Sequence, residues 1–449
     1  MTDLLLTGAT LLTGDPAQPV IADGFVAIAG DRISGLGPSA ALSPSFGAAR
    51  RLALAGRVIV PGFVNIHTHA ALCLMRGIAL DMGHAPAYTP GVPHGHEIGP
   101  NEAVSLARLG ALEALLFGST VMADSFVHAD LTLPAMAELG LRVFACGRIH
   151  DVDFSRVHDG EWRYDEAIGD ATLTATRALL QTHHGSHGGR ANVILAPHAP
   201  DTCSDHLLEK VALMARDTGL RVMIHLSQSP AENRVIRERS GTTPAELLAR
   251  VGLLNDRLIA AHCIHVTNDD VARIGAAGVT VAHVPKGNAT GGSMAPTPAL
   301  RDAGARLALG TDNLTQDMAE AMRWALAVAR VQEHTVGPSW QPRDVFAMAT
   351  SNGAAALGLD GEIGRLMPGY RADLAVFDFR RPHLAPCLDP LGTLVHDAQG
   401  RDVEHVFIDG RHVVRDGKAT LVDEAVIRAD AQAVAERLWA RARLAAQTH

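Results

Sequence analysis

The hydrophobic pattern of residues 58–313 alternates between two kinds of segment. Short apolar runs rich in β-branched residues are each followed by a longer Ala/Leu-rich stretch with helical spacing, and Gly or Pro separates one from the next. The eight runs predicted to be strands are Val58–Ile66, Thr120–Phe126, Arg142–Arg148, Asn192–Ala196, Arg221–Leu226, Leu258–Cys263, Val279–Val284 and Leu307–Gly310.

The stretches between these runs are predicted to be helices, among them Asn101–Leu116, Asp205–Thr218, Thr243–Arg250 and Asp269–Ala276. Continuous apolar strands are typical of parallel sheets that helices cover on both faces. Eight alternating β and α units therefore predict the α/β class and, over residues 58–361, a TIM-like (β/α)8 barrel.

The two ends of the chain have a different pattern, with short strands separated by turns. The predicted strands are Leu4–Thr7, Gly24–Ala29, Asp31–Leu36, Ala372–Phe377 and Val403–Ile408, the last followed by the hairpin signal Asp409-Gly410. We expect residues 1–57 and 362–420 to pack together as one small β-sandwich domain. Residues 421–449 are rich in Ala, Arg and Glu and predict a C-terminal helix.

Composition narrows the functional classes. With 47% hydrophobic and 19% charged residues among 449, the chain is expected to be compact rather than disordered. The net charge is −9 and no long run of Lys or Arg occurs, which argues against nucleic acid or a membrane surface as partner. No stretch of 18 apolar residues and no secretory pattern is present, so we expect a cytoplasmic protein.

Histidine is over-represented, with 23 residues against 18 for Phe, Trp and Tyr combined. In a barrel of this kind, catalytic groups lie at the carboxyl ends of the strands. The predicted strands end at His67 and His69, His198, His225, His262, His283 and Asp312. Residues two apart in an extended chain point to the same face, so His67 and His69 can approach one ion.

Imidazole nitrogen and carboxylate oxygen are ligands of borderline divalent cations, and a catalytic site keeps one position open for water. His67, His69, His225 and Asp312 meet this need for one ion, with Zn²⁺ as first choice and Fe²⁺, Mn²⁺ or Co²⁺ as alternatives. Water bound to such an ion loses a proton near neutral pH. We expect Asp312 to accept that proton and His262 to orient the resulting hydroxide.

Several motifs occur in the order typical of one superfamily. They are Pro61–His69, Leu74–Gly77, Pro197–Pro200, His225-Leu226, Ala261–Cys263, Pro285–Asn288, Gly310–Asn313 and Pro368–Leu374. Over nearly its whole length the chain resembles the amidohydrolase superfamily, and within it the branch of S-adenosylhomocysteine/methylthioadenosine deaminases and triazine hydrolases.

The resemblance implies a distorted barrel that holds a single Zn²⁺ or Fe²⁺ beside a small β-domain. It implies the same four ligands, His262 as the residue that orients water, and His198 as a substrate contact. By the same motifs, Arg76, Asn288 and Asn313 are expected to contact a small-molecule substrate. The resemblance also implies a homodimer or homotetramer.

Two residues depart from the family pattern. Deaminases of this branch usually carry a glutamate three residues after the strand-five histidine, where this chain has Gln228. An amide cannot exchange a proton at neutral pH. Either Glu232 substitutes, or Asp312 and His262 carry all proton transfer, or the leaving group is different. Asp201 stands where adenosine-type deaminases tend to have an aromatic residue, which argues against adenosine.

Two functions follow from these residues. The first is hydrolytic deamination of an amino-substituted heterocycle of purine, pterin or triazine type. The second is hydrolysis of an amide, urea or carbamate bond, in which Gln228 donates a hydrogen bond to a carbonyl oxygen. Both are hydrolyses of C–N bonds other than peptide bonds.

Overall fold

The structure is a computed structural model of the chain and describes residues 2–78, 81, 91–93, 95–313 and 315–447. Its central part contains two parallel sheets of four strands each. The first holds β6 (Phe63–Thr68), β7 (Ser119–Ser125), β8 (Arg142–Cys146) and β9 (Ala191–Val193), and the second holds β10 (Val222–Leu226), β11 (Leu258–His262), β12 (Thr280–His283) and β13 (Arg306–Leu309).

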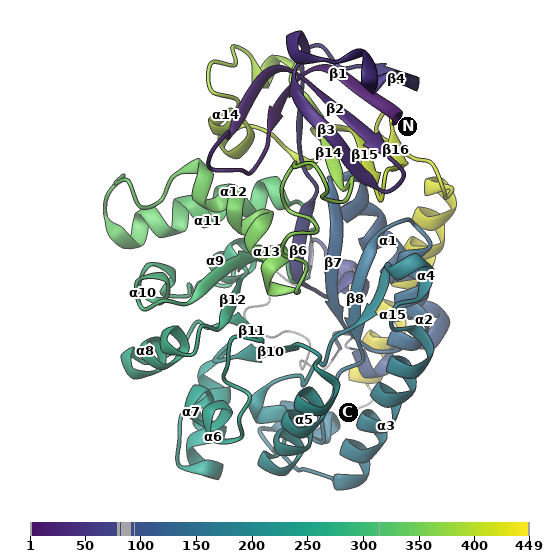
Figure 1. Ribbon diagram of the computed structural model, residues 1–449. Coiled ribbons are helices and arrows are strands. Elements are labelled where there is room, and N and C mark those ends of the chain that lie inside the picture. The colour runs from purple at the N-terminus through teal and green to yellow at the C-terminus, as the bar shows by residue number, and fades with distance from the viewer. Residues whose placement is uncertain (1, 79–80, 82–90, 94, 314, 448–449) are drawn as a thin grey trace.

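Backbone hydrogen bonds connect the two sheets at both of their edges. Next to β9, the N–H of Met223 donates to the carbonyl of Leu195 at 2.8 Å. Beyond β13, the N–H of Asp312 donates to the carbonyl of His67 at 3.0 Å. The helices lie outside these strands (Figure 1), so the central part is a TIM-barrel-like α/β unit, in agreement with the α/β class predicted from the sequence.

The first predicted barrel strand, Val58–Ile66, is in fact two strands. Residues Arg57–Pro61 form β5, which pairs with β14 (Leu374–Asp378) in a separate sheet, and β6 begins only at Phe63. The break is at Gly62, where a Cβ atom would lie 2.2 Å from the side chain of Thr120. The boundary expected at residue 58 therefore falls inside β5.

Both chain ends contribute to this separate sheet. Its nine strands include β5 and β14 together with β1 (Thr2–Leu12), β2 (Val20–Ala29), β3 (Arg32–Pro38), β4 (Ala48–Ala53), β15 (Val403–Ile408), β16 (Arg411–Arg415) and β17 (Lys418–Ala419). The sequence predicts a sandwich, whereas hydrogen bonds join all nine strands into one continuous sheet. Leu6, Ile59 and Phe407 are buried in the core of this terminal sheet.

The α-helices of the described residues are α1 (Pro100–Leu116), α2 (Ala129–Ala137), α3 (Glu166–His183), α4 (Ser186–Gly189), α5 (Asp205–Thr218), α6 (Pro230–Ser240), α7 (Pro244–Arg250), α8 (Asn268–Ala276), α9 (Pro285–Thr290), α10 (Thr297–Asp302), α11 (Met318–Glu333), α12 (Pro342–Ala349), α13 (Ser351–Ala356), α14 (Pro390–His396) and α15 (Glu424–Gln447). The four predicted helices between the strands correspond to α1, α5, α7 and α8 within one residue at each end. Side-chain caps such as Ser204 on α5 and Thr243 on α7 explain where helices begin. Of the helices in the described ranges, none combines the length and apolar character needed to span a bilayer.

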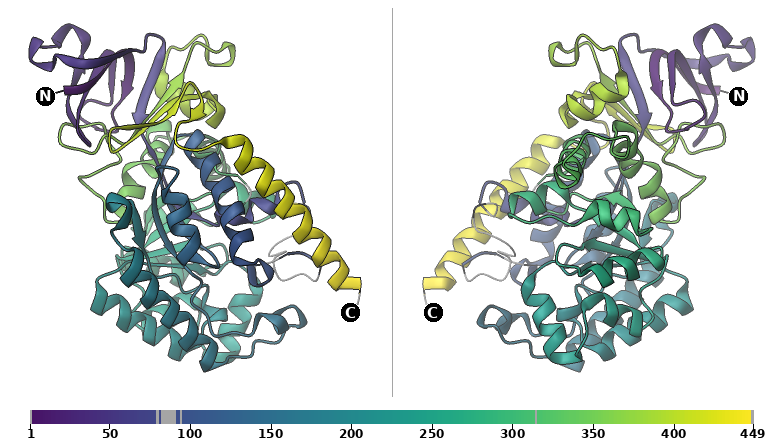
Figure 2. Two further views of the ribbon diagram at one scale, coloured as in Figure 1. Left: turned by 90° about the vertical axis from the view of Figure 1, so that its right-hand side faces the viewer. Right: turned by 90° about the vertical axis from the view of Figure 1, so that its left-hand side faces the viewer.

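The C-terminal helix α15 crosses the outside of the central unit beside α1 (Figure 2). The indole N–H of Trp439 donates to the carbonyl of Leu74 at 3.0 Å. Arg441 pairs with Glu102 in the first turn of α1 at 3.1 Å. These contacts attach the last helix to the segment that follows β6.

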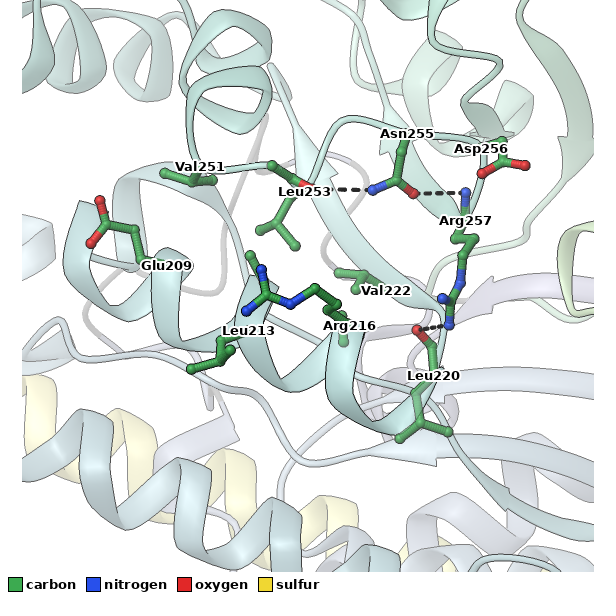
Figure 3. A pocket seen from close by; sticks show the side chains of 13 residues that line it. Glu209, Leu213, Arg216, Leu220, Val222, Val251, Leu253, Asn255, Asp256 and Arg257 are labelled. Carbon is green, nitrogen blue, oxygen red and sulfur yellow. Dashed lines mark hydrogen bonds between the residues drawn. The ribbon is translucent and has the colours of Figure 1, made fainter.

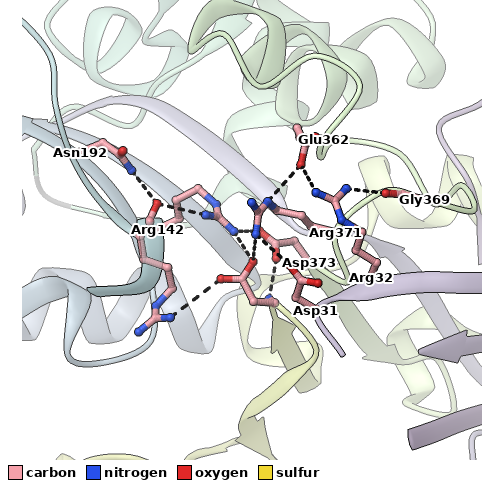
Figure 4. A network of polar contacts seen from close by, with 11 residues as sticks. Asp31, Arg32, Arg142, Asn192, Glu362, Gly369, Arg371 and Asp373 are labelled. Atoms are coloured by element: carbon pink, nitrogen blue, oxygen red, sulfur yellow. Dashed lines mark hydrogen bonds and ion pairs between the residues drawn. The ribbon is translucent and has the colours of Figure 1, made fainter. Parts of the chain in front are cut away.

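A buried ion network joins the start of β8 to the terminal sheet (Figure 4). The guanidinium of Arg142 pairs with Asp373 at 3.3 Å and with Asp409 at 2.7 Å, and its side chain is 3% exposed. Arg371 adds a second cation at 2.9 Å from Asp409. Arg190 lies 3.9 Å from Asp409 as well, so three arginines compensate two buried carboxylates and fix the terminal sheet against the central strands.

Replacement of Arg142 by Ala should strongly destabilise the protein, because Asp373 loses the cation that compensates its burial and Asp409 keeps only its pairs with Arg371 and Arg190. The expected loss is about 3–5 kcal/mol in the free energy of unfolding, measured by urea denaturation. The control is Arg32→Ala, which removes a pair with Glu362 whose side chains are 39% and 41% exposed and should cost at most about 1 kcal/mol. Equal losses in the two variants would contradict the role given to Arg142.

Candidate metal centre

The histidines predicted at the strand ends converge in the structure. Ligand atoms of His67, His69 and His225 lie within 4.8 Å of one another, and so do those of His67, His262 and Asp312. The Nε2 atoms of His69 and His225 are 3.2 Å apart. Oδ1 of Asp312 lies 3.4 Å from Nε2 of His69 and 3.8 Å from Nε2 of His67.

The backbone sets the direction of each ring. Nδ1 of His69 donates to the carbonyl of Ser125 at 2.6 Å, and Nδ1 of His225 donates to the carbonyl of His198 at 2.5 Å. Both Nε2 atoms therefore present lone pairs to the same small volume. Two nitrogens bound at about 2.0–2.1 Å to one tetrahedral ion stand roughly 3.3 Å apart, close to the distance observed here.

Two further ring nitrogens fit the same volume. Nε2 of His67 and Nε2 of His262 are buried and have no hydrogen-bond partner in the part of the chain that the structure describes. Nδ1 of His67 faces the sulfur of Met223 at 3.4 Å, and Nδ1 of His262 bonds to Oδ1 of Asn288 at 2.9 Å. A buried polar atom without a partner is costly, so the site is suited to a cation.

The close contact of β6 with the end of β13 depends on Gly310. A Cβ atom at this position would lie 2.8 Å from Cβ of His67. Asp312 follows in the left-handed conformation with φ 62°, and its N–H and carbonyl bond to the backbone of His67 and His69. A strained, over-determined backbone of this kind is typical of functional sites.

A buried polar network holds this junction. The amide of Asn65 donates to Oγ1 of Thr311 at 2.7 Å and to Oε1 of Gln316 at 3.1 Å. The hydroxyl of Thr68 donates to the carbonyl of Asp312 at 2.9 Å. Sequence reasoning missed Asn65 and Gln316, although Asn65 precedes His67 by two residues and so faces the same side of the strand. The network fixes the ligand backbone rather than touching the reacting atoms.

The remaining predicted residues are placed as follows. His198 lies beside His225 with ring centroids 4.9 Å apart, and its Nδ1 bonds to Thr202. Asn288 is 5% exposed and accepts a hydrogen bond from Nδ1 of His262. Asn313 directly follows Asp312 and is half-buried. Arg76 pairs with Glu113 on α1, and its side chain is 38% exposed. His283 is 1% exposed, and both of its ring nitrogens are without a partner among the described residues.

Glu232, one of the three alternatives for the missing glutamate at position 228, has its carboxylate bound to the backbone. Its carboxylate is buried and accepts hydrogen bonds from the backbone N–H groups of Ser227 at 2.7 Å and of Gln228 at 2.8 Å. Both oxygens are thus bound to the turn that follows β10. Glu232 holds the backbone of Gln228 instead of replacing its side chain.

Arg148 is a charged group near the metal centre that sequence reasoning missed. It could have been found, because it is the last residue of the predicted strand Arg142–Arg148 and this fold places functional groups at the carboxyl ends of its strands. Its guanidinium lies 4.5 Å over the ring of Phe126, whose centroid is 6.1 Å from that of His69. The positive charge contributes to lowering the pKa of both His69 and His198, after the larger effect of burial. It makes the site more attractive to anionic groups.

Two other features are separate from this centre. Glu404, His405 and Asp416 also have metal-ligand spacing, but Arg57 already pairs with Glu404 at 2.9 Å and the N–H of Asp416 donates to Nδ1 of His405. A pocket between α5 and the segment before β11 lies at the amino ends of β10 and β11, opposite the histidines (Figure 3). Neither feature contributes a group to the metal centre.

Burial favours the neutral form of His67, His69 and His225. It lowers the pKa of His67 and His69 well below the ordinary value of 6.5, and neighbouring His225 lowers them further. The pKa of His225 falls to about 3, chiefly through burial and then through His262. Burial raises the pKa of Asp312. Neutral imidazole is the form that binds metal.

The metal-free protein should therefore lose stability as the pH falls below about 6.5, because the unfolded chain takes up protons on histidines that the folded chain keeps neutral. Each such histidine adds a loss of about 1.4 kcal/mol per pH unit between its unfolded and folded pKa values. Urea denaturation of chelator-treated protein at about pH 7 and about pH 5.5 measures the effect. A variant with His67, His69 and His225 replaced by Gln should show a smaller pH dependence, and an equal one would contradict this interpretation.

Comparison with known proteins agrees with this geometry. Residues 58–413 match the Amidohydrolase family. A 5-methylthioadenosine/S-adenosylhomocysteine deaminase of Pelotomaculum thermopropionicum is 36% identical over 445 residues, which cover 98% of this chain and 99% of the relative.

Two solved structures are similar over almost the whole chain. An adenosine deaminase of Xanthomonas campestris with bound zinc has a TM-score of 0.87 and 27% identity, with 97% of this chain and 98% of that chain covered. A triazine hydrolase of Arthrobacter aurescens has a TM-score of 0.85 and 23% identity, with 97% and 100% covered, and shows the same fold. With a family match over most of its length and a relative of this identity, the chain belongs to the amidohydrolase family.

Proposed function

We propose that this protein removes an amino group from an aminopurine-type heterocycle by hydrolysis, with the aid of one divalent metal ion. The observation that carries the proposal is the convergence of buried, neutral imidazoles whose Nε2 atoms face one another. Further support comes from the relative that is a 5-methylthioadenosine/S-adenosylhomocysteine deaminase and from the zinc-containing adenosine deaminase of similar fold. The reaction exchanges an amino group for oxygen and releases ammonia.

The residues present fit a divalent ion. His67, His69, His225 and Asp312 are the proposed ligands, and neutral nitrogen with carboxylate oxygen is a donor set typical of Zn²⁺. A divalent ion held there supplies Lewis acidity, because it lowers the pKa of bound water and polarises the group under attack. Zn²⁺ is our first choice, while Fe²⁺, Mn²⁺ and Co²⁺ accept the same donors.

His262 and Asp312 are suited to moving the protons. Because Nδ1 of His262 donates to Asn288, its Nε2 is an acceptor that can bind and orient the attacking water. The carboxylate of Asp312 can take a proton from this water and return it to the leaving nitrogen. Burial raises the pKa of Asp312, which makes it a better base than an exposed aspartate.

Gln228 favours one alternative function. An amide side chain can hydrogen-bond to a substrate carbonyl but cannot deliver a proton to a ring nitrogen. Cleavage of an amide, urea or carbamate requires only the proton that Asp312 returns to the leaving amine. We keep this reaction as the second candidate, with the same metal centre.

We further propose that the two four-stranded sheets form one distorted (β/α)8 barrel, which begins at Phe63 rather than at the expected residue 58 and extends to residue 361. The hydrogen bonds at both edges of the two sheets support this interpretation. The terminal sheet then represents the expected small domain of residues 1–57 and 362–420, extended by β5 to Pro61. In such a barrel the metal centre lies at the carboxyl ends of the strands, where this fold places catalytic groups.

The two candidate functions give different products. The zinc-loaded protein would be incubated with adenosine, 5-methylthioadenosine, S-adenosylhomocysteine, aminopterins, aminotriazines, aryl ureas and carbamates, and the products identified by mass spectrometry. Deamination predicts an intact skeleton, ammonia and a higher rate in Gln228→Glu, which restores a proton carrier. A substrate cut into two organic fragments would instead establish the second candidate.

Replacement of Asp312 by Asn should lower turnover by about 10²–10⁴-fold, because an amide of the same size cannot hold the transferred proton. Steady-state kinetics and the zinc content of the purified variant are the measurements. Asp302→Asn is the control, since the side chain of Asp302 is 72% exposed on α10. Activity of Asp312→Asn close to that of the parent protein would overturn the role proposed for this carboxylate.

A further inference from the structure

Gln228 lies in the turn between β10 and α6, three residues after His225. The backbone of this turn is strained, because Ser227 has a φ of 48°, in the left-handed region that non-glycine residues rarely adopt. Conformations of this kind persist only where surrounding contacts hold them. The source of those contacts decides how firmly the Gln228 side chain is placed.

Glu232, in the first turn of α6, supplies two of these contacts. One oxygen accepts from the N–H of Ser227 at 2.7 Å and the other from the N–H of Gln228 at 2.8 Å. Its own N–H donates to the hydroxyl of Ser229, the residue that caps the helix, at 3.1 Å. Hydrogen bonds to a carboxylate are short and about twice as strong as neutral ones.

The turn is also connected to the segment that follows the neighbouring strand. The carbonyl of Ser227 accepts from the N–H of His265 at 2.9 Å. The amide of Asn233 on α6 donates to the carbonyl of His265 at 2.6 Å. His265 follows His262 by three residues. These two hydrogen bonds therefore fix the position of the turn that holds Gln228 relative to the segment that holds His262.

The burial of Glu232 indicates that its carboxylate stabilises the backbone of this turn. The residue is 2% exposed, and in the described part of the chain no Lys, Arg or His lies within ion-pair distance of it. A buried carboxyl without a cation is costly and is retained only where hydrogen bonds compensate it. The nearby carboxyl of Asp201 adds to the effect of burial in raising the pKa of Glu232.

We infer that Glu232 is a positioning residue, which fixes the backbone of Ser227 and Gln228 so that the Gln228 amide meets the substrate in one orientation. The inference rests on the proposed function. It assigns to Glu232 a role other than proton transfer, since both of its oxygens are bound to backbone N–H groups. The amide at position 228 is then a fixed hydrogen-bonding group for the heterocycle or carbonyl under attack.

The test uses Glu232→Gln in the zinc-loaded full chain. The amide keeps one acceptor but turns an NH₂ group toward one of the two backbone donors, so one hydrogen bond is lost. We expect kcat to fall by about 10–100-fold, as for other residues that orient catalytic groups, with zinc content unchanged. Hydrogen exchange followed by mass spectrometry should show faster exchange in the peptide that contains Ser227 and Gln228.

Combination with Gln228→Ala separates positioning from a general structural effect. If Glu232 acts through Gln228, then Glu232→Gln should change kcat less than about 2-fold in the Gln228→Ala background. Two matched controls are available, one at the residue that caps α6 and one on α6 itself. Ser229→Ala removes the helix cap without touching the carboxylate, and Glu238→Gln alters an exposed residue. Neither should reproduce the exchange or the kinetic change.

The outcomes are distinct. Unchanged exchange in Glu232→Gln, or an equal loss of kcat in the presence and absence of the Gln228 side chain, would overturn the inference. The same holds if Ser229→Ala gives the same changes, because helix stability alone would then explain them. A parent protein inactive on every compound of the panel would overturn the proposed function, and the exchange measurement would still decide whether Glu232 holds the turn.

Discussion

The arrangement of the site depends on one electrostatic constraint, the meeting of buried, unprotonated ring nitrogens at the ends of neighbouring strands. Nε2 of His69 and Nε2 of His225 are 3.2 Å apart, while each Nδ1 is already bound to a backbone carbonyl. Their lone pairs repel one another unless a cation lies between them. Because burial opposes protonation, a metal ion relieves this repulsion better than a proton does.

The same chain uses buried charge in two different ways. Between β8 and the terminal sheet, Arg142 and Arg371 compensate buried carboxylates from within the protein. At the metal centre, Nε2 of His67 has no hydrogen-bond partner among the described residues. The backbone N–H of His67 donates to Asn65, which in turn donates to Gln316. The ion network stabilises the fold, whereas the metal centre keeps ring nitrogens available to bind a ligand.

The turn after β10 illustrates how a change in one side chain depends on its surroundings. Gln228 removes a titratable group from the centre, yet the carboxylate of Glu232 remains buried four residues later. It is bound to the backbone rather than to the centre. The proposed function therefore assigns proton transfer to Asp312 and His262, and hydrogen bonding to the amide at position 228. This division of tasks is consistent with deamination and with amide or urea cleavage alike.

The sequence by itself determined the elements and the types of residue at the strand ends. Periodicity and capping residues are local properties, so α5 has the predicted bounds and α7 begins one residue after its predicted start. His67, His69 and His225 could be grouped because the ends of parallel strands meet at one edge. The tertiary structure alone decided the break at Gly62, the pairing of Arg76 with Glu113 and the direction of the Glu232 carboxylate. These depend on which distant or neighbouring groups come within hydrogen-bond or van der Waals distance, and a one-dimensional pattern does not contain that information.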